Sequence, residues 1–135
     1  MSYLLDTNAV SEIMKPAPEP SVFSWLEEHE HDFFVSAISI GEIERGIALL
    51  PIGRKKSRLQ ELYREFSQGM EGRVLSFDVA VARRWARLAS TARRKGRTLS
   101  VLDSMIEATA LHWDLLVVTR NISDFAEVTT INPWK

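Results

Sequence analysis

The sequence contains no cysteine, which excludes disulfide bonds, thiolate catalysis and zinc–thiolate sites and fits a reducing compartment. No apolar run has the length of a membrane span, and no basic segment followed by an apolar stretch opens the chain. We therefore expect a cytoplasmic protein with no membrane partner. The net charge of −1 excludes a surface that is basic throughout, so contacts with nucleic acid must come from local clusters such as residues 54–58 and 93–97.

Repeats, low-complexity tracts and linkers are also missing, and 135 residues suit a single domain over residues 1–135. Short apolar segments alternate with amphipathic ones along the chain. The predicted strands are Tyr3–Leu5, Phe33–Val35, Val74–Phe77, Leu115–Val118 and Val128–Ile131. The predicted helices are Thr7–Met14, Val22–Glu30, a segment with Ile43, Ile47 and Leu50 on one face, Leu59–Phe66, Val79–Arg94 and Val101–Trp113. This alternation indicates an α/β fold with a parallel sheet covered on both faces.

Four acidic residues lie near the predicted ends of strands or starts of helices. Asp6 ends the first strand, Glu42 lies in the first turns of the helix after the second strand, and Asp124 follows the fourth strand by a few residues. Asp103 lies near the start of the helix before the fourth strand, and it joins the others only if that helix begins at the same edge of the sheet. Ligand sites in parallel α/β folds lie beyond the carboxyl ends of the strands.

Carboxylates that converge there would repel one another, which raises their pKa values or demands cations. Mg²⁺ prefers oxygen ligands, and two such ions align a water and a leaving oxygen for phosphodiester hydrolysis. Each acid also has an ordinary structural explanation as a helix cap, a partner of the helix dipole or a turn former. The first helix is expected to open on Thr7 or Asn8 as its cap. The pattern alone leaves both interpretations open.

Two other protein classes also open with an aspartate at the end of a strand. Haloacid-dehalogenase-type phosphatases have a second aspartate two positions later, where this chain has Asn8. Phosphoacceptor receiver domains need an acidic pair after the first strand and an aspartate after the third, and only Asp6 and Asp78 are available. The spacing therefore disfavours both classes.

An ordered set of motifs spans essentially the whole chain. It comprises Leu5-Asp6-Thr7-Asn8, Ser11-Glu12-Ile13, residues 40–47, residues 50–54, residues 102–108, residues 118–125 and Ile131-Asn132-Pro133-Trp134. In this order the motifs resemble those of PIN-domain ribonucleases, and more narrowly those of the VapC toxins of bacterial toxin–antitoxin pairs, in the FitB-like branch.

The resemblance implies a three-layer α/β/α sandwich with a central, mainly parallel five-stranded sheet. It implies an endoribonuclease dependent on Mg²⁺ or Mn²⁺ whose acidic quartet is Asp6, Glu42, Asp103 and Asp124. Asp6 and Asp103 are then the direct metal ligands, and Glu42 and Asp124 complete the shell, partly through water. The implied partners are an RNA substrate and a small cognate antitoxin with a DNA-binding N-terminus, with homodimers and toxin–antitoxin hetero-oligomers.

Polar residues beside the acids match the positions that orient the carboxylates or touch the scissile phosphate in the family. These residues are Thr7, Asn8, Thr119 and Asn121. The candidate RNA contacts are Arg45, Arg120, Arg93, Arg94 and Arg97, although a solvated surface explains these cations almost as well. The expected reaction is in-line attack on phosphorus, with no histidine as a base.

One residue departs from the family pattern, and one alternative function stays open. Glu107 lies one helical turn after Asp103, where many relatives carry a small residue. It either alters the metal site or pairs with an arginine. The alternative to a nuclease is a PIN-fold binding module in an antitoxin–DNA repressor complex, with little cleavage of its own.

Overall fold

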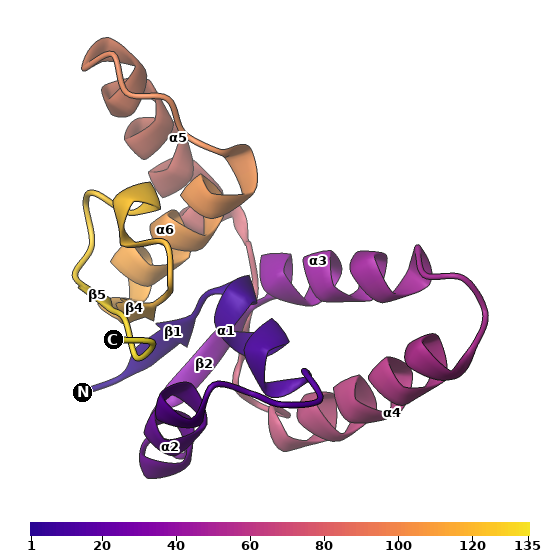
Figure 1. The fold of residues 1–135 in the computed structure, drawn as a ribbon. Coiled ribbons are helices and arrows are strands. Elements are labelled where there is room, and N and C mark those ends of the chain that lie inside the picture. Colours follow the sequence, from indigo (N-terminus) through magenta and orange to yellow (C-terminus); the bar gives the residue numbers. More distant parts are fainter.

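The computed structural model describes residues 1–135 as alternating strands and helices (Figure 1). In chain order they are β1 (Tyr3–Leu5), α1 (Thr7–Ile13), α2 (Pro20–Glu28), β2 (Phe33–Ser36), α3 (Ala37–Ala48), α4 (Arg54–Gly69), β3 (Val74–Leu75), α5 (Val79–Arg94), α6 (Val101–Trp113), β4 (Leu116–Val118), the 3-10 turn η1 (Ile122–Asp124) and β5 (Thr130–Ile131). None of the helices is both long enough and apolar enough to cross a membrane.

The five strands form one parallel sheet in the order β3-β2-β1-β4-β5. The first strand of the sequence is therefore the central one, and Leu4 pairs with Phe34 on one side and Val117 on the other. The expected α/β architecture with a parallel five-stranded sheet is confirmed. Because all strands run the same way, their carboxyl ends meet at one edge of the sheet.

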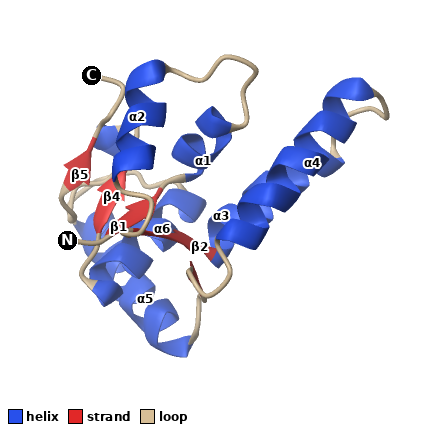
Figure 2. Cartoon of the chain, turned by 90° about the horizontal axis from the view of Figure 1, so that it is seen from below, coloured by secondary structure: helices blue, strands red, loops and turns tan.

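Alternate residues of the central strand pack against different helix layers, as the period of a strand requires. Tyr3 and Leu5 belong to the core that α1, α2, α3 and α4 cover. Leu4 belongs to a second core with Ile106 of α6, and α5 packs on the outer side of α6 through Val81. Figure 2 shows α1 and α2 on one side of the strands and α5 on the other. The predicted three layers are therefore present.

Helices α3 and α4 form a hairpin that reaches away from the sheet (Figure 1). The Tyr63 hydroxyl of α4 donates a hydrogen bond to Glu44 of α3 at 2.6 Å, and Lys56 Nζ donates to the carbonyl of Ala48 at 3.2 Å. Arg58 ties the hairpin back to the end of α1 through the carbonyl of Met14 at 3.2 Å. The hairpin thereby forms one wall of a groove that lies beside the end of α1.

Several predicted boundaries are wrong by a few residues. Helix α4 begins at Arg54 rather than Leu59, because its first turn is basic and solvated and carries no apolar pattern. Strands β3 and β5 are each two residues long, since Phe77 packs onto the α5–α6 core and Val128 onto the α6 core instead of pairing. The predicted start of β4 at Leu115 is also wrong by one residue, since the strand begins at Leu116.

Candidate active site

Asp6 lies at the carboxyl end of the central strand and is nearly buried, with 4% of its surface exposed. Its backbone N–H donates to the carbonyl of Val118 at 2.9 Å, which continues the ladder between β1 and β4. Its Oδ1 accepts the backbone N–H of Thr7 at 2.8 Å, so Asp6 is the N-cap of α1. The expected cap at Thr7 or Asn8 is therefore wrong. Asp6 caps the helix and also belongs to an acidic site.

Thr119, which follows β4, is fully buried and holds the second oxygen of Asp6. Its hydroxyl donates to Asp6 Oδ2 at 2.8 Å. Thr119 Oγ1 itself accepts hydrogen bonds from Asn8 Nδ2 at 3.4 Å and from the backbone N–H of Asn121 at 3.0 Å. Asn8 Oδ1 in turn accepts the N–H of Arg120 at 3.4 Å. Three of the predicted supporting residues thus form one network around Asp6.

Thr7, the fourth supporting residue, holds Glu42. Its hydroxyl donates to Glu42 Oε1 at 2.7 Å and lies 2.9 Å from the hydroxyl of Ser39. Glu42 is delivered by α3, which begins directly after β2 because Ser36 caps it through the N–H of Ile38 at 3.0 Å. The carboxyl end of β2 therefore leads into the helix that places Glu42 at the edge of the sheet where Asp6 lies.

A pocket of about 370 Å³ opens over these strand ends. Its lining consists of Asp6, Thr7, Asn8, Ser11, Glu12, Lys15, Glu42, Asp103, Arg120, Asn121 and Trp134. Asp103 reaches it because α6 begins at this edge, with Ser100 as its N-cap. Asp124 does not line the pocket; it is exposed on η1 and acts electrostatically on Asp103. The structure thus brings three predicted acids into one pocket and leaves the fourth beside it.

Two carboxyl groups of this pocket, those of Asp6 and Asp103, have raised pKa values. Burial raises the pKa of Asp6 to about 6, assisted by the negative charges of Asp103 and Glu42 and opposed by the hydrogen bonds from Thr119 and Thr7. Burial also raises the pKa of Asp103, and the charges of Asp124 and Glu42 add to this effect. The ionised forms of these two carboxyl groups are therefore disfavoured unless positive charge is brought to the site.

The side chains of this pocket suit a hard divalent cation. The acidic side chains that line the pocket are carboxylates, and the lining contains no histidine or cysteine. Oxygen ligands of this kind are those that Mg²⁺ and Mn²⁺ prefer. No three acidic or histidine side chains come close enough to enclose an ion by themselves. Such an ion would have to keep several water ligands, which is the usual behaviour of Mg²⁺. The residues present therefore fit the expected metal.

Of the five candidate RNA contacts, Arg120 lines the pocket. Arg45, Arg93 and Arg94 are exposed on α3 and α5 and do not line it. Arg97 is half-buried, and its Nη2 donates to the carbonyl of Asp124 at 3.3 Å. Arg97 therefore holds the segment that carries Asp124.

Glu107 is fully buried on α6 and makes no ion pair within 4 Å. Its Oε2 accepts the backbone N–H of Glu127 at 2.9 Å. Burial raises the pKa of Glu107, while that N–H and the nearby charge of Arg97 oppose the shift. Glu107 thus fastens the chain after η1 to the helix that carries Asp103, instead of forming the expected arginine pair.

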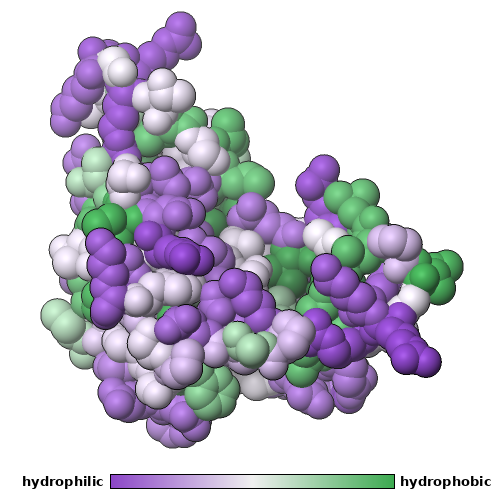
Figure 3. Space-filling model, in the orientation of Figure 1, coloured by the Kyte–Doolittle hydropathy of each residue, from purple (hydrophilic) through white to green (hydrophobic).

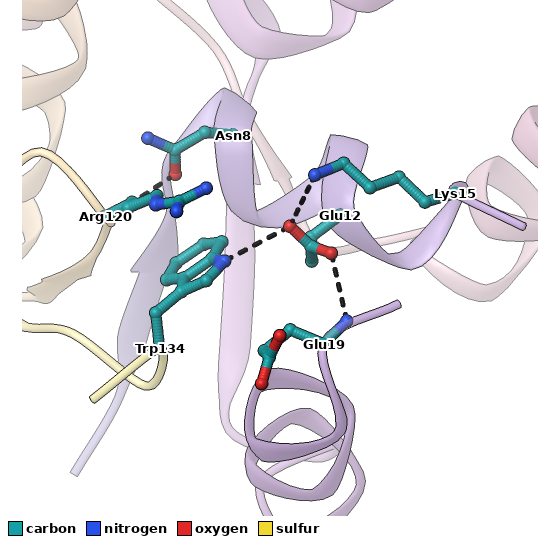
Figure 4. Close-up of polar contacts among 6 residues, drawn as sticks. All are labelled: Asn8, Glu12, Lys15, Glu19, Arg120 and Trp134. Atoms are coloured by element: carbon teal, nitrogen blue, oxygen red, sulfur yellow. Dashed lines mark hydrogen bonds and ion pairs between the residues drawn. The ribbon is translucent and has the colours of Figure 1, made fainter. Parts of the chain in front are cut away.

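Sequence reasoning missed four residues of the pocket wall, namely Ser11, Glu12, Lys15 and Trp134. Figure 4 shows the indole of Trp134 between Arg120 and Glu12, with Lys15 on the other side of Glu12. A signal for two of them was available, because Asn8, Glu12 and Lys15 are spaced to share one face of the first helix. No spacing in the sequence linked Trp134 to this face.

Comparison with known proteins gives close relatives over nearly the whole chain. The family model described as the PIN domain matches residues 3–130. Toxin FitB of Neisseria gonorrhoeae is 39% identical over 135 residues, with 97% of each chain covered. VapC ribonuclease Y4jK of Sinorhizobium fredii is 35% identical, with 98% of this chain and 97% of the relative covered.

Solved structures agree with these matches. The crystal structure of FitAcB from Neisseria gonorrhoeae has a TM-score of 0.90 at 39% identity, with 98% of both chains covered. A structure of FitAB bound to an IR36 DNA fragment has a TM-score of 0.91 at 37% identity, with 98% of this chain and 96% of that chain covered. The chain therefore belongs to the PIN-domain family, in the ribonuclease group formed by the VapC and FitB toxins of toxin–antitoxin systems.

Proposed function

We propose that this chain is an endoribonuclease that hydrolyses RNA phosphodiester bonds with Mg²⁺ or Mn²⁺, as the toxin of an antitoxin pair in the cytoplasm. The observation that carries the proposal is the pocket in which Asp6, Glu42 and Asp103 converge and in which burial and mutual repulsion raise the pKa of Asp6 to about 6. A pocket with this excess of negative charge binds a divalent cation more readily than it binds an anionic substrate alone.

Asp6 and Asp103 are the proposed direct ligands, with Glu42 and Asp124 completing the shell in part through water. A divalent cation bound there supplies a Lewis acid that lowers the pKa of a water ligand and neutralises charge on the phosphate. Thr119 and the N–H of Thr7 fix both oxygens of Asp6, and the Thr7 hydroxyl fixes Glu42. These contacts hold the carboxylates in place before substrate arrives.

An antitoxin partner is supported by a second hollow next to the acidic pocket. This groove of about 410 Å³ lies between the end of α1 and the α3–α4 hairpin and includes Met14, Ile43, Ile47 and Leu59. Figure 3 shows apolar surface in this hollow, surrounded by polar side chains. An amphipathic segment of a small antitoxin fits such a groove.

Self-association is proposed as well. Large apolar side chains are exposed on helices outside the acidic pocket, among them Val79 on α5 and Val101 and Trp113 on α6. These are the side chains that a homodimer or a toxin–antitoxin hetero-oligomer would cover.

The nuclease proposal is tested with purified protein freed of antitoxin and incubated with mixed RNA, with Mg²⁺ or with EDTA. We expect cleavage with Mg²⁺ only, and a loss of about 100-fold or more in Asp6→Asn and Asp103→Asn. Asp114→Asn is the matched control, because Asp114 is exposed and has a φ of 55°, which asparagine also adopts. Cleavage that persists in EDTA or in Asp6→Asn would contradict the proposal.

The alternative function is a binding module with little cleavage, and the observation in its favour is the relative solved as FitAB bound to a DNA fragment. Its outcome in the same experiment is different. A protein that binds antitoxin and operator DNA but leaves every RNA intact with Mg²⁺ is a binding module.

A further inference from the structure

An acidic pocket that receives RNA must also offer positive charge to the phosphates of the substrate. Two cationic side chains line the pocket, Lys15 at the end of α1 and Arg120 directly after β4. They lie 105 positions apart in the sequence. Their arrangement at the pocket is therefore a property of the folded chain.

Arg120 is exposed, yet it is held on two sides. Its guanidinium carbon lies 5.9 Å from the centre of the Trp134 ring, within the range of a cation–π interaction. Its backbone N–H donates to Asn8 Oδ1 at 3.4 Å. The indole of Trp134 thus serves as a platform for the guanidinium at the wall of the pocket.

Trp134 and Lys15 both donate a hydrogen bond to the same oxygen atom of Glu12. Glu12 Oε1 accepts hydrogen bonds from Lys15 Nζ at 2.9 Å and from Trp134 Nε1 at 3.1 Å (Figure 4). The other oxygen, Oε2, accepts the backbone N–H of Glu19 at 3.0 Å, at the start of α2. Glu12 is 4% exposed, and its carboxylate is fully engaged by these three donors.

The exposed end of this array is positive. The side chain of Lys15 is 53% exposed, whereas that of Glu12 is 5% exposed. The hydrogen bonds from Lys15, Glu19 and Trp134 lower the pKa of Glu12 against the opposing effect of burial, so this carboxylate stays charged. Lys15 gives Glu12 one of its three N–H donors, which leaves two for an anion.

We propose that Glu12 and Trp134 are positioning residues that hold Lys15 and Arg120 as a two-cation subsite for RNA phosphates next to the scissile bond. This inference rests on the proposed nuclease function. The subsite places cations at the mouth of a pocket whose floor is acidic. A polyanion is then held by its neighbouring phosphates while the scissile phosphate faces the carboxylates.

The subsite is tested by the binding of a short, fluorescein-labelled single-stranded RNA of mixed sequence in EDTA, measured by fluorescence anisotropy at several salt concentrations. Each phosphate contact contributes about 0.7 to the slope of log K against log salt for single strands. We expect Lys15→Gln and Arg120→Gln each to reduce the slope by about that amount. Arg83→Gln on α5 is the matched control, since it removes an exposed cation on the opposite side of the sheet and should leave the RNA slope at the wild-type value.

Glu12→Gln separates positioning from simple charge. Removing a negative charge tightens RNA binding if only net charge matters. We expect the opposite, a several-fold weaker binding, because one amide oxygen cannot accept the hydrogen bonds from Lys15, Glu19 and Trp134 together. Trp134→Phe, which keeps an aromatic face for Arg120, should bind more tightly than Trp134→Ala.

The outcomes also separate this inference from the proposed nuclease function. The subsite is overturned if Lys15→Gln and Arg120→Gln have the same salt slope as the wild type. It is also overturned if Glu12→Gln binds RNA more tightly than the wild type, or if the wild type does not bind RNA. A protein with the expected slopes that does not cleave RNA with Mg²⁺ overturns the nuclease proposal alone. Thermal unfolding of each variant shows whether it is folded. If Glu12→Gln does not fold, Lys15→Gln and Arg120→Gln still test the subsite, because both of these side chains are exposed.

Discussion

Replacing Asp6 with asparagine is expected to make the metal-free protein more stable at neutral pH, although it removes a proposed catalytic group. Asp6 is nearly buried and lies beside two other carboxylates, so its ionised form is disfavoured in the folded chain. A carboxyl with a raised folded-state pKa binds its proton more tightly in the folded than in the unfolded chain. The stability that it contributes is complete below its ordinary pKa of 3.8 and is lost as the pH rises through about 6.

The size of the effect follows from the shift. A rise from 3.8 to about 6 corresponds to a destabilisation of about 3 kcal/mol above pH 6. Asparagine has the same shape and no charge, but it must also replace the hydrogen bonds that Asp6 accepts from Thr7 and Thr119. Each is worth about 1 kcal/mol, so the net gain in the free energy of unfolding near pH 7.5 is about 1–3 kcal/mol.

Urea unfolding in EDTA measures this gain across the pH range. The advantage of Asp6→Asn over the wild type should be small near pH 4 and should grow until about pH 7. Excess Mg²⁺ should then stabilise the wild type more than the variant, because a ligand that binds the folded state alone raises its stability. A variant less stable than the wild type at neutral pH, or a difference that does not change with pH, would refute the electrostatic reasoning.

Substitutions at three further positions test the hydrogen bonds around the acids and the packing of the core. Thr119→Val should lower the free energy of unfolding by about 1–3 kcal/mol and cleavage by about 10–100-fold, and Thr119→Ser should restore both, as measured by urea unfolding and initial rates. Glu107→Ala leaves the N–H of Glu127 without its buried acceptor and should cost about 1–3 kcal/mol, whereas Glu107→Gln should cost less; equal losses would contradict this role. Leu5→Ala should cost about 2–5 kcal/mol in the same assay, because Leu5 is fully buried in the central strand.

Long periodic segments were predicted from the sequence to the residue. Val79–Arg94 and Val101–Trp113 have the predicted bounds, because caps at Asp78 and Ser100 coincide with the first residues of an apolar face. The start of α4 was missed because it carries charge instead of apolar periodicity. The edge strands β3 and β5 were predicted too long, since packing, which is absent from a local pattern, decides where pairing stops.

Three of the four predicted acids lie in one pocket, whereas Asp124 lies beside it and much of the surrounding wall was not predicted. Asp6 and Glu42 follow strands directly, so the topology of a parallel sheet brings them together. The position of Asp103 depends on the direction of α6, which a sequence pattern does not give and the resemblance to a family did. Trp134 reaches the pocket through a contact with Glu12 more than a hundred positions earlier, and no local rule connects the two.

Because β1 is the central strand, the sheet and the acidic pocket can be completed only after later parts of the chain have been made. The first strand pairs with β4, and the helix after Asp6 is joined to Trp134 near the far end of the sequence. A chain still growing on the ribosome therefore has neither a finished sheet nor a closed pocket wall until the segments that carry β4 and Trp134 have emerged. Contacts of such long sequence separation also form slowly. The wall of the pocket that contains Trp134 therefore closes only after the segment that carries this residue has been made.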